Sequence, residues 1–198
     1  MENNLPEEEL VARAKKGDQA ALSQLVLNYS SRIYHLGLRL TGSHQDAEDI
    51  LQDTFLIMVK KINQFQGKSS FYTWLYRIAM NVGLRKLKSK PRKYEHISLD
   101  DPDFERVSSE AASEWPDFDY DIVNDPHFRQ RLDRLIEQLP EKYRTVFILR
   151  DLHGLSTEDT SRILQITPSN TKIRLMRARN FLKENLEKML KTEMQLWS

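Results

Sequence analysis

The spacing of apolar residues limits the fold more than any other feature of this sequence. Apolar side chains recur at intervals of three and four residues, which is the period of one buried face of an amphipathic helix. The chain has only six glycines and seven prolines among 198 residues, which is few for a β-rich fold. We therefore expect an all-α protein, with a short helix ending at Gly17, a second helix from Asp18 to Gly42, and further helices over 43–62, 70–88, 127–138, 141–151, 157–165 and 168–190.

One segment interrupts the helical pattern. Residues 91–126 contain four prolines, many acidic side chains and no sustained period. Proline lacks the amide proton that a helix interior needs, and it also disfavours helical geometry in the residue before it. The sequence therefore predicts two helical domains, residues 1–90 and 127–198, joined by an acidic flexible linker over 91–126.

The composition excludes several classes of protein. The longest apolar runs are about five residues, far below the roughly 18 that a membrane-spanning helix needs, and the acidic N-terminus lacks the apolar stretch of a signal peptide. The absence of cysteine excludes disulfides, a thiol nucleophile and cysteine-ligated metals. The five histidines are scattered, and no nucleotide-binding or hydrolase motif occurs. We expect no metal, no cofactor, no direct membrane insertion and no catalytic residues.

Charged residues are sorted along the chain. The formal net charge is only +1. Residues 54–94 nevertheless carry 10 basic and no acidic residues, whereas residues 95–126 carry 11 acidic residues and one basic residue. A long cationic block that is also rich in aromatic residues favours a surface that faces a polyanion such as nucleic acid. The alternative is a solvated helix face whose lysines serve solubility.

A helix-turn-helix is the first functional motif. A short helix over 157–164, a turn over 165–167 and a longer basic helix follow one another in the order typical of this motif. A recognition helix places its N-terminal end in the major groove, where its outward residues meet bases and phosphates. The candidate DNA contacts are Ser169, Asn170, Lys172, Ile173, Arg174, Met176 and Arg177. The alternative is an ordinary helical hairpin with one basic helix.

Aromatic and basic residues alternate over 65–93 and form the second motif. Rings can stack on unpaired bases while cations follow the phosphates, and Asn81 could hydrogen-bond the edge of a flipped base. The candidate contacts with single-stranded DNA are Phe65, Lys68, Ser70, Phe71, Tyr72, Trp74, Arg77, Asn81, Arg85, Lys86 and Lys88. The alternative is that the larger rings belong to the core, and for Trp74 we favour the core.

Carboxylates line one face of the helix predicted over 43–62. Paired carboxylates raise the question of a metal, but no histidine or glutamate lies at the spacing of a dinuclear site. The apolar side chains beside them favour a docking surface for a basic protein partner instead. Its candidate residues are Asp46, Asp49, Gln52, Asp53 and Leu56.

Five stretches, in order along the chain, carry a family resemblance. They are AKKGDQAALSQLV, DAEDILQDTFLIM, FYTWLYRIAMN, LPEKYRTVFILRDLHGLS and RLMRAR, and together they cover about 120 of the 198 residues. The chain resembles the extracytoplasmic-function (ECF) sigma factors, the minimal class of bacterial sigma factor with regions 2 and 4 only. The resemblance implies an alternative sigma factor that directs core RNA polymerase to specific promoters and initiates transcription.

The resemblance also implies roles in the N-terminal half. The face with Asp49, Gln52 and Asp53 would grip the clamp helices of the largest polymerase subunit. The loop over 65–72, together with Asn81, would capture a flipped base of the minus-ten promoter element. The backbone of that element would be held by Arg85, Lys86 and Lys88.

For the rest of the chain the resemblance implies further partners. The minus-thirty-five element would be read by Lys172, Arg174, Met176 and Arg177, and region 4 would contact the flap of the polymerase. The acidic linker would thread polymerase channels built for nucleic acid. An anti-sigma factor would mask the docking surfaces, and the protein would be cytoplasmic, with a membrane-held pool if that partner is a membrane protein.

The chain departs from the family pattern at three places. The usual Gly-Thr-Val at the start of the recognition helix is Ser169-Asn170-Thr171, and the usual Glu-Ile-Ala of the preceding helix is Asp159-Thr160-Ser161. Gly83 stands where many relatives carry a larger residue. These departures bear on the minus-thirty-five sequence and on packing, and they leave the class intact.

Two other functions fit parts of the sequence. A stand-alone helix-turn-helix transcription regulator, which binds DNA without polymerase, would have no need of the acidic and apolar face over 46–57. A protein-only helical signalling adaptor would have no salt-dependent affinity for DNA and would not depend on Lys172 or Arg177. A helical enzyme ranks third because no acid–base constellation can be named.

Overall fold

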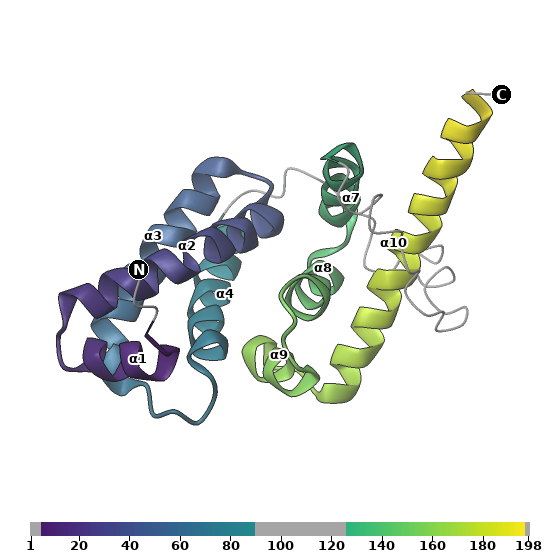
Figure 1. Ribbon diagram of the computed structural model, residues 1–198. Coiled ribbons are helices and arrows are strands. Elements are labelled where there is room, and N and C mark those ends of the chain that lie inside the picture. Colours follow the sequence, from purple (N-terminus) through teal and green to yellow (C-terminus); the bar gives the residue numbers. More distant parts are fainter. Residues whose placement is uncertain (1–4, 90–125, 197–198) are drawn as a thin grey trace. The chain divides into compact units, whose positions relative to one another are not determined.

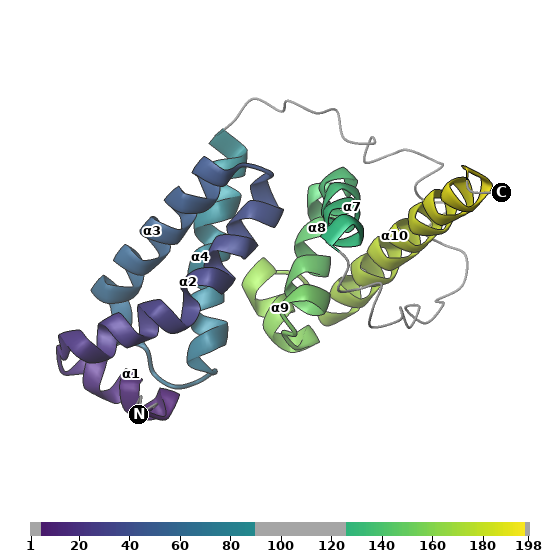
Figure 2. The ribbon, with the colours of Figure 1, turned by 45° about the horizontal axis from the view of Figure 1, so that its top comes forward.

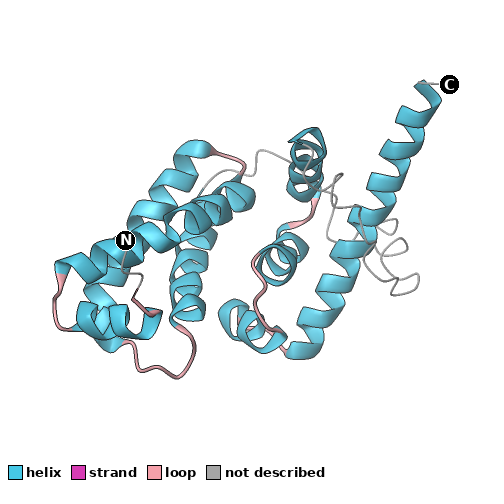
Figure 3. Ribbon diagram, viewed as in Figure 1, coloured by secondary structure: helices cyan, strands magenta, loops and turns pink. Residues whose placement is uncertain are grey.

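All regular structure in the described part of the chain is helical. The computed structural model describes residues 5–89 and 126–196, and Figure 3 shows their helices. The all-α prediction is confirmed for these residues. The chain forms two compact units, Met1–Pro91 and Arg92–Ser198, which are described separately below. Of the linker predicted over 91–126, only Pro126 lies within the described residues, where it begins a helix.

The described residues of the first unit, 5–89, form four α-helices and one short 3-10 helix, which Figure 1 labels in part. They are α1 (Glu7–Lys15), α2 (Gln19–Thr41), α3 (His44–Lys61), η1 (Ile62–Gln64) and α4 (Phe71–Ser89). Side chains cap α2 and α3: the Asp18 carboxylate accepts from the backbone N–H groups of Ala20 and Ala21, and the Ser43 hydroxyl accepts from that of Asp46. Gly42 ends α2 in the left-handed conformation, at φ 66°.

Helices α2, α3 and α4 enclose the core of this unit, and Figure 2 shows α3 and α4 lying side by side. The apolar stripe of each helix is buried there, which removes its side chains from water and supplies most of the stabilisation. The fully buried residues include Leu25, Ile33, Leu36, Leu40, Ile50, Met58, Leu75, Tyr76 and Met80. Because one side of α4 is inside, its charged residues lie toward the other side.

Gly83 lets α4 approach α2 closely. A Cβ atom at this position would overlap Cδ2 of Leu40, a side chain with 0% exposure, and would lie 3.5 Å from Cδ1 of Ile50. Glycine at residue 83 therefore has a packing reason: Leu40 fills the space that a larger side chain would occupy.

Replacing Gly83 with alanine should destabilise the first unit by about 1–2 kcal/mol, because overpacking outweighs the gain in helix propensity. In a Leu40→Ala background the same change should stabilise it by up to about 1 kcal/mol, since the space is then open. Urea denaturation of the full chain, followed by Trp74 fluorescence in a Trp115→Phe, Trp197→Phe background, measures both effects. The same sign in both backgrounds would contradict this account.

The second unit contains α7 (Pro126–Gln138), α8 (Glu141–Phe147), the π-helical turn η2 (Ile148–Leu152), α9 (Thr157–Leu164) and α10 (Pro168–Leu196). The sequence predicted one helix over 141–151, and the structure divides it at Phe147. The N–H of His153 donates to the carbonyl oxygen of Ile148 at 3.1 Å, which is the wider spacing of a π-turn. Helix α10 runs to Leu196, beyond the end predicted near residue 190.

The core of the second unit is centred on α8. Residues 145–149 of α8 and η2 are buried in succession, so this segment is enclosed on all sides instead of on one stripe. Helix α10 packs against it through Leu175, Ala178 and Leu182. The opposite side of α10 near its N-terminal end is thereby left outside.

Candidate functional site

The predicted docking face of α3 is present on the surface of the first unit. Gln52, Asp53 and Leu56 are exposed, with Leu56 at 51%, and the side chain of Asp49 is 49% exposed. Val59, one turn further along, is also exposed, at 47%. Spacings of three and four residues put these side chains on one face, which combines carboxylates with accessible apolar groups.

Asp46 differs from its neighbours in the predicted set because it is only 4% exposed. It sits in the first turn of α3, where its N–H donates to Ser43 Oγ and its negative charge suits the helix dipole. Its carboxylate lies 3.6 Å from the ammonium of Lys86. Burial of Asp46 gives it a role inside the unit, and the accessible face begins at Asp49.

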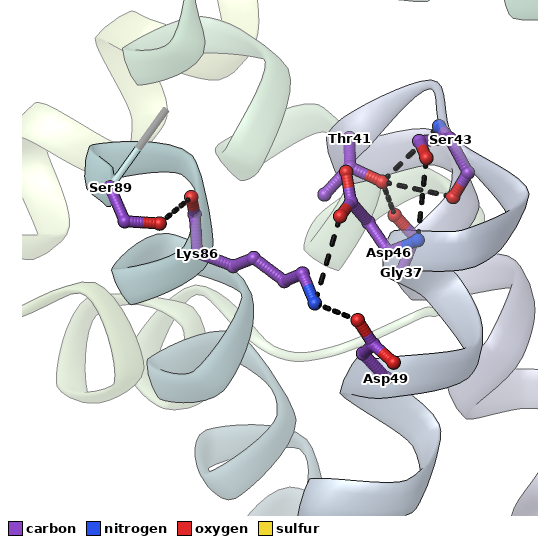
Figure 4. A network of polar contacts seen from close by, with 7 residues as sticks. All are labelled: Gly37, Thr41, Ser43, Asp46, Asp49, Lys86 and Ser89. Atoms are coloured by element: carbon purple, nitrogen blue, oxygen red, sulfur yellow. Dashed lines mark hydrogen bonds and ion pairs between the residues drawn. The ribbon is translucent and has the colours of Figure 1, made fainter. Parts of the chain in front are cut away.

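Lys86 connects α4 to this face, as Figure 4 shows. Its ammonium donates to Asp49 Oδ2 and lies beside Asp46, so one cation balances two carboxylates. The hydrogen bond to Asp49 raises the pKa of Lys86 above its ordinary value of 10.5. The sequence assigned Lys86 to the DNA backbone, but in this structure its charge is directed to α3.

Replacing Lys86 with methionine should cost about 0.5–1 kcal/mol of stability, because a partly exposed ion pair is lost. Lys88→Met, which removes an exposed charge from the same helix, should change the free energy of unfolding far less. The difference should shrink in high salt. This difference in stability should be fully present below pH 10.5, the ordinary pKa of lysine. It should vanish as the pH rises through the raised pKa of Lys86 in the folded protein. Denaturation with the Trp74 probe measures it, and equal costs for the two variants would argue against the pair.

The loop between η1 and α4 begins in a cluster of aromatic rings. The Phe65 centroid lies 5.7 Å from that of Phe71 and 5.4 Å from that of Trp74, and the Phe71 and Trp74 centroids are 5.6 Å apart. Phe71 is 3% exposed, whereas Phe65 and Trp74 are half-buried. These contacts make Phe71 a support for the loop, and they leave part of the Phe65 and Trp74 rings accessible.

Two tyrosines extend this cluster along α4. The Tyr72 and Tyr76 centroids are 4.3 Å apart, and the guanidinium of Arg32 lies 5.9 Å from the centre of the Tyr72 ring. Tyr76 is fully buried and Tyr72 half-buried, and burial raises the pKa of both phenols. Neither phenol ionises near neutral pH, so Tyr72 offers a neutral ring to any ligand at this surface.

Polar residues occupy the outer side of the loop and of α4. Ser70 caps α4, because its Oγ accepts from the N–H of Thr73 at 3.1 Å. Four further side chains lie on one outer face of α4, because Arg77, Asn81, Arg85 and Lys88 follow one another at spacings of four, four and three residues. Arg85 Nε donates to the Asn81 carbonyl oxygen. The exposed set is Lys68, Ser70, Arg77, Asn81, Arg85 and Lys88.

The helix-turn-helix of the second unit is formed by α9 and α10. Ser156 caps α9, and the Thr167 hydroxyl accepts from the N–H of Asn170 at 3.1 Å. Gln165 turns the chain with φ 56°, an uncommon value for a residue other than glycine. Ser161 and Thr171 meet in the interior through hydroxyls 2.9 Å apart. This contact gives each buried hydroxyl a polar partner.

Exposure along the N-terminal end of α10 is uneven. Ser169, Lys172 and Ile173 are exposed, with Ile173 at 45%. The other predicted contacts are half-buried: Asn170, Arg174, Met176 and Arg177. Arg177 donates to the phenol oxygen of Tyr143 at 3.2 Å, so it faces α8. Lys172 and Ile173 are therefore the most accessible residues of the predicted reading face.

Sequence reasoning missed a partly buried ion pair behind this face. Nε and one terminal nitrogen of Arg179 donate to the two carboxylate oxygens of Asp151, each at 2.7 Å. This bidentate hydrogen bonding raises the pKa of Arg179. In the sequence, the only sign of this pair is that Asp151 and Arg179, 28 residues apart, carry opposite charges. The pair joins α10 to η2 and holds the recognition helix against the unit.

Neither a metal cluster nor a spanning helix occurs in the part of the chain that the structure describes. No group of three or more histidine, aspartate or glutamate side chains there could hold an ion. No helix among the same residues is long and apolar enough to cross a membrane.

Comparisons with known proteins match both units. The family model for Sigma-70 region 2 matches residues 25–93, and that for Sigma-70 region 4 matches residues 129–182. The RNA polymerase sigma-H factor of Pseudomonas aeruginosa is 31% identical over 185 residues, which are 93% of this chain and 96% of that protein. The ECF RNA polymerase sigma-E factor of Escherichia coli K12 is 31% identical over 191 residues, 96% of this chain and 100% of that protein.

Two solved structures have a similar fold. The structure of CnrH in complex with the cytosolic domain of CnrY has a TM-score of 0.65 and 22% identity, and covers 92% of this chain and 97% of that chain. The sigma factor RpoE from Bartonella quintana, in complex with the anti-sigma factor NepR, has a TM-score of 0.60 and 22% identity, and covers 83% and 96% of the two chains.

Proposed function

This chain belongs to the ECF sigma factors of bacterial RNA polymerase, and from that premise we propose how its surfaces divide the work of initiation. As an alternative sigma factor it directs core polymerase to specific promoters. This function replaces the two alternatives of a stand-alone regulator and a protein-only adaptor. The observation that carries the division of work is that one unit exposes an acidic, apolar face on α3 and a cationic face on α4.

The α3 face is proposed as the docking surface for core polymerase. Asp49, Gln52 and Asp53 lie on the N-terminal side of the exposed Leu56, which gives a polar rim beside an apolar contact. Carboxylates on such a rim steer a basic partner and fix its register, while burial of the leucine supplies hydrophobic free energy. The expected partner surface is the clamp helices of the largest subunit.

Replacing Asp53 with arginine should weaken binding to core polymerase about tenfold, because a rim carboxylate becomes a like charge facing a basic partner. Glu9→Arg is the matched control, since it makes the same charge change at an exposed position on α1. Fluorescence anisotropy of labelled chain titrated with bacterial core enzyme measures the affinity. Equal affinities for the two variants would contradict the proposed surface.

The α4 face and the preceding loop are proposed to open the minus-ten element. Arg77, Arg85 and Lys88 would follow phosphates, while Asn81 would hydrogen-bond a flipped base. The accessible parts of Phe65 and Trp74 offer stacking surfaces. Unstacking a base costs a few kcal/mol, and these contacts would offset that cost without covalent chemistry. We therefore propose that the chain is an initiation factor and not an enzyme.

The N-terminal end of α10 is proposed to read the minus-thirty-five element. Lys172 can donate to guanine in the major groove, and Ile173 can meet a thymine methyl group. Arg174 is placed to contact a phosphate, and Met176 supplies a second apolar contact on this face. Arg177 is bonded to Tyr143, so its proposed role includes holding α10 in place.

Lys172→Ala should weaken holoenzyme binding to duplex promoter DNA about tenfold and reduce the slope of log affinity against log salt by about one. Arg134→Ala, an equal charge change at an exposed position on α7, is the control. Filter binding at several salt concentrations measures both quantities. If the two variants lose the same affinity, the reading face lies elsewhere.

An anti-sigma partner is part of the proposal. RpoE of Bartonella quintana was solved with the anti-sigma factor NepR, and CnrH with the cytosolic domain of CnrY. We propose that such a partner covers the α3 face and so competes with core polymerase. The chain would act in the cytoplasm, where the polymerase works, and a membrane-bound partner would hold part of it at the membrane.

A further inference from the structure

Helix α1 lies outside the residues matched by the region 2 family model, which begin at 25. It is nevertheless an integral part of the first unit. Leu10, Val11 and Ala14 are 2%, 6% and 2% exposed, and α1 packs against both α2 and η1. Since η1 leads directly into the loop at Phe65, α1 is attached to the start of the proposed minus-ten surface.

A hydrogen bond reaches the loop from the end of α1. The Lys15 ammonium donates to the carbonyl oxygen of Phe65 at 2.9 Å, across 50 residues of sequence. Phe65 is the C-cap of η1, and its own N–H donates to the carbonyl of Ile62. Phe65, the residue at which the loop begins, is thus held by η1 through its N–H and by Lys15 through its carbonyl oxygen.

The start of α1 reaches the other end of the loop through Tyr29. The Tyr29 phenol donates to the Glu7 carboxylate, and its ring packs edge-on against Phe71 with centroids 5.7 Å apart. Tyr29 is 5% exposed. Partial burial raises the pKa of Glu7, opposed by the charge of Arg32. Phe71 is the first residue of α4, so α1 supports the loop at both of its ends.

We propose that α1 is a positioning element for minus-ten recognition, in which Lys15 and Glu7 hold the loop over 65–71 in its DNA-binding conformation. This inference rests on the proposed function of that loop. A loop ordered before binding avoids part of the conformational entropy cost that binding would otherwise carry. Lys15 acts through the Phe65 peptide, and it need not touch DNA.

The test compares Lys15→Met with Lys16→Met in holoenzyme. Both remove one positive charge from adjacent exposed positions, but only Lys15 is bonded to the loop. The probe is a labelled single-stranded DNA 12-mer selected from a random pool by the wild-type holoenzyme. Lys15→Met should weaken its binding three- to tenfold relative to Lys16→Met, and Lys15→Arg, which keeps a donor, should restore most of the loss. Affinity for core enzyme and the unfolding midpoint should be the same for the two methionine variants.

Two further results separate this inference from the function on which it rests. Asn81→Ala removes the proposed base contact itself and should weaken binding of the same probe. If Asn81→Ala weakens binding but Lys15→Met equals Lys16→Met, the role of α1 is overturned and the minus-ten surface stands. If Asn81→Ala also has no effect, the minus-ten surface is wrong and the inference fails with it. The role of α1 would also be overturned if Lys15→Met weakened binding to core polymerase as much as binding to the DNA probe, because the defect would then be general.

Discussion

The surfaces of this protein depend on the burial of one apolar stripe on each of two cationic helices. In α4 the stripe with Leu75, Ala79 and Val82 faces α2 and α3, and in α10 the stripe with Leu175, Ala178 and Leu182 faces α8. Removing these stripes from water fixes the rotation of each helix about its axis. The arginines, lysines and asparagine on the opposite sides are then held outward, where a polyanion can meet them. Hydrophobic packing therefore determines which charges are presented.

Ion pairs within each unit reduce the positive charge that remains for partners. Lys86 is directed to Asp49 and Asp46, and Arg179 is held by Asp151. In the described part of the cationic block at 54–94, the charge of Lys86 is consequently balanced inside the unit, which lowers the positive charge left for partners. Paired groups stiffen the contacts between helices, whereas Arg77, Arg85 and Lys88 are exposed on the outer side of α4.

Local features could be predicted from the sequence because they depend on neighbouring residues. The caps at Asp18 and Ser43 and the helical stripes are of this kind. Contacts between distant segments were not predictable, since they require the register of one helix against another. The burial of Asp46, the bond from Lys15 to Phe65 and the pairing of Ser161 with Thr171 belong to this second kind. The sequence pattern also placed Phe71 among the candidate DNA contacts. An aromatic ring can stack on a base or pack in the core, and only its neighbours in the fold distinguish these roles.

The contact of Gly83 with Leu40 also bears on how this sequence can diverge. Enlarging residue 83 first overpacks its contact with residue 40, whereas shrinking residue 40 first opens a cavity. Either substitution made alone thus gives a less stable protein. Which of the two comes first decides how unstable this intermediate is. Related chains that carry a bulkier residue at 83 should differ at 40 as well, so that the two positions evolve as a coupled pair.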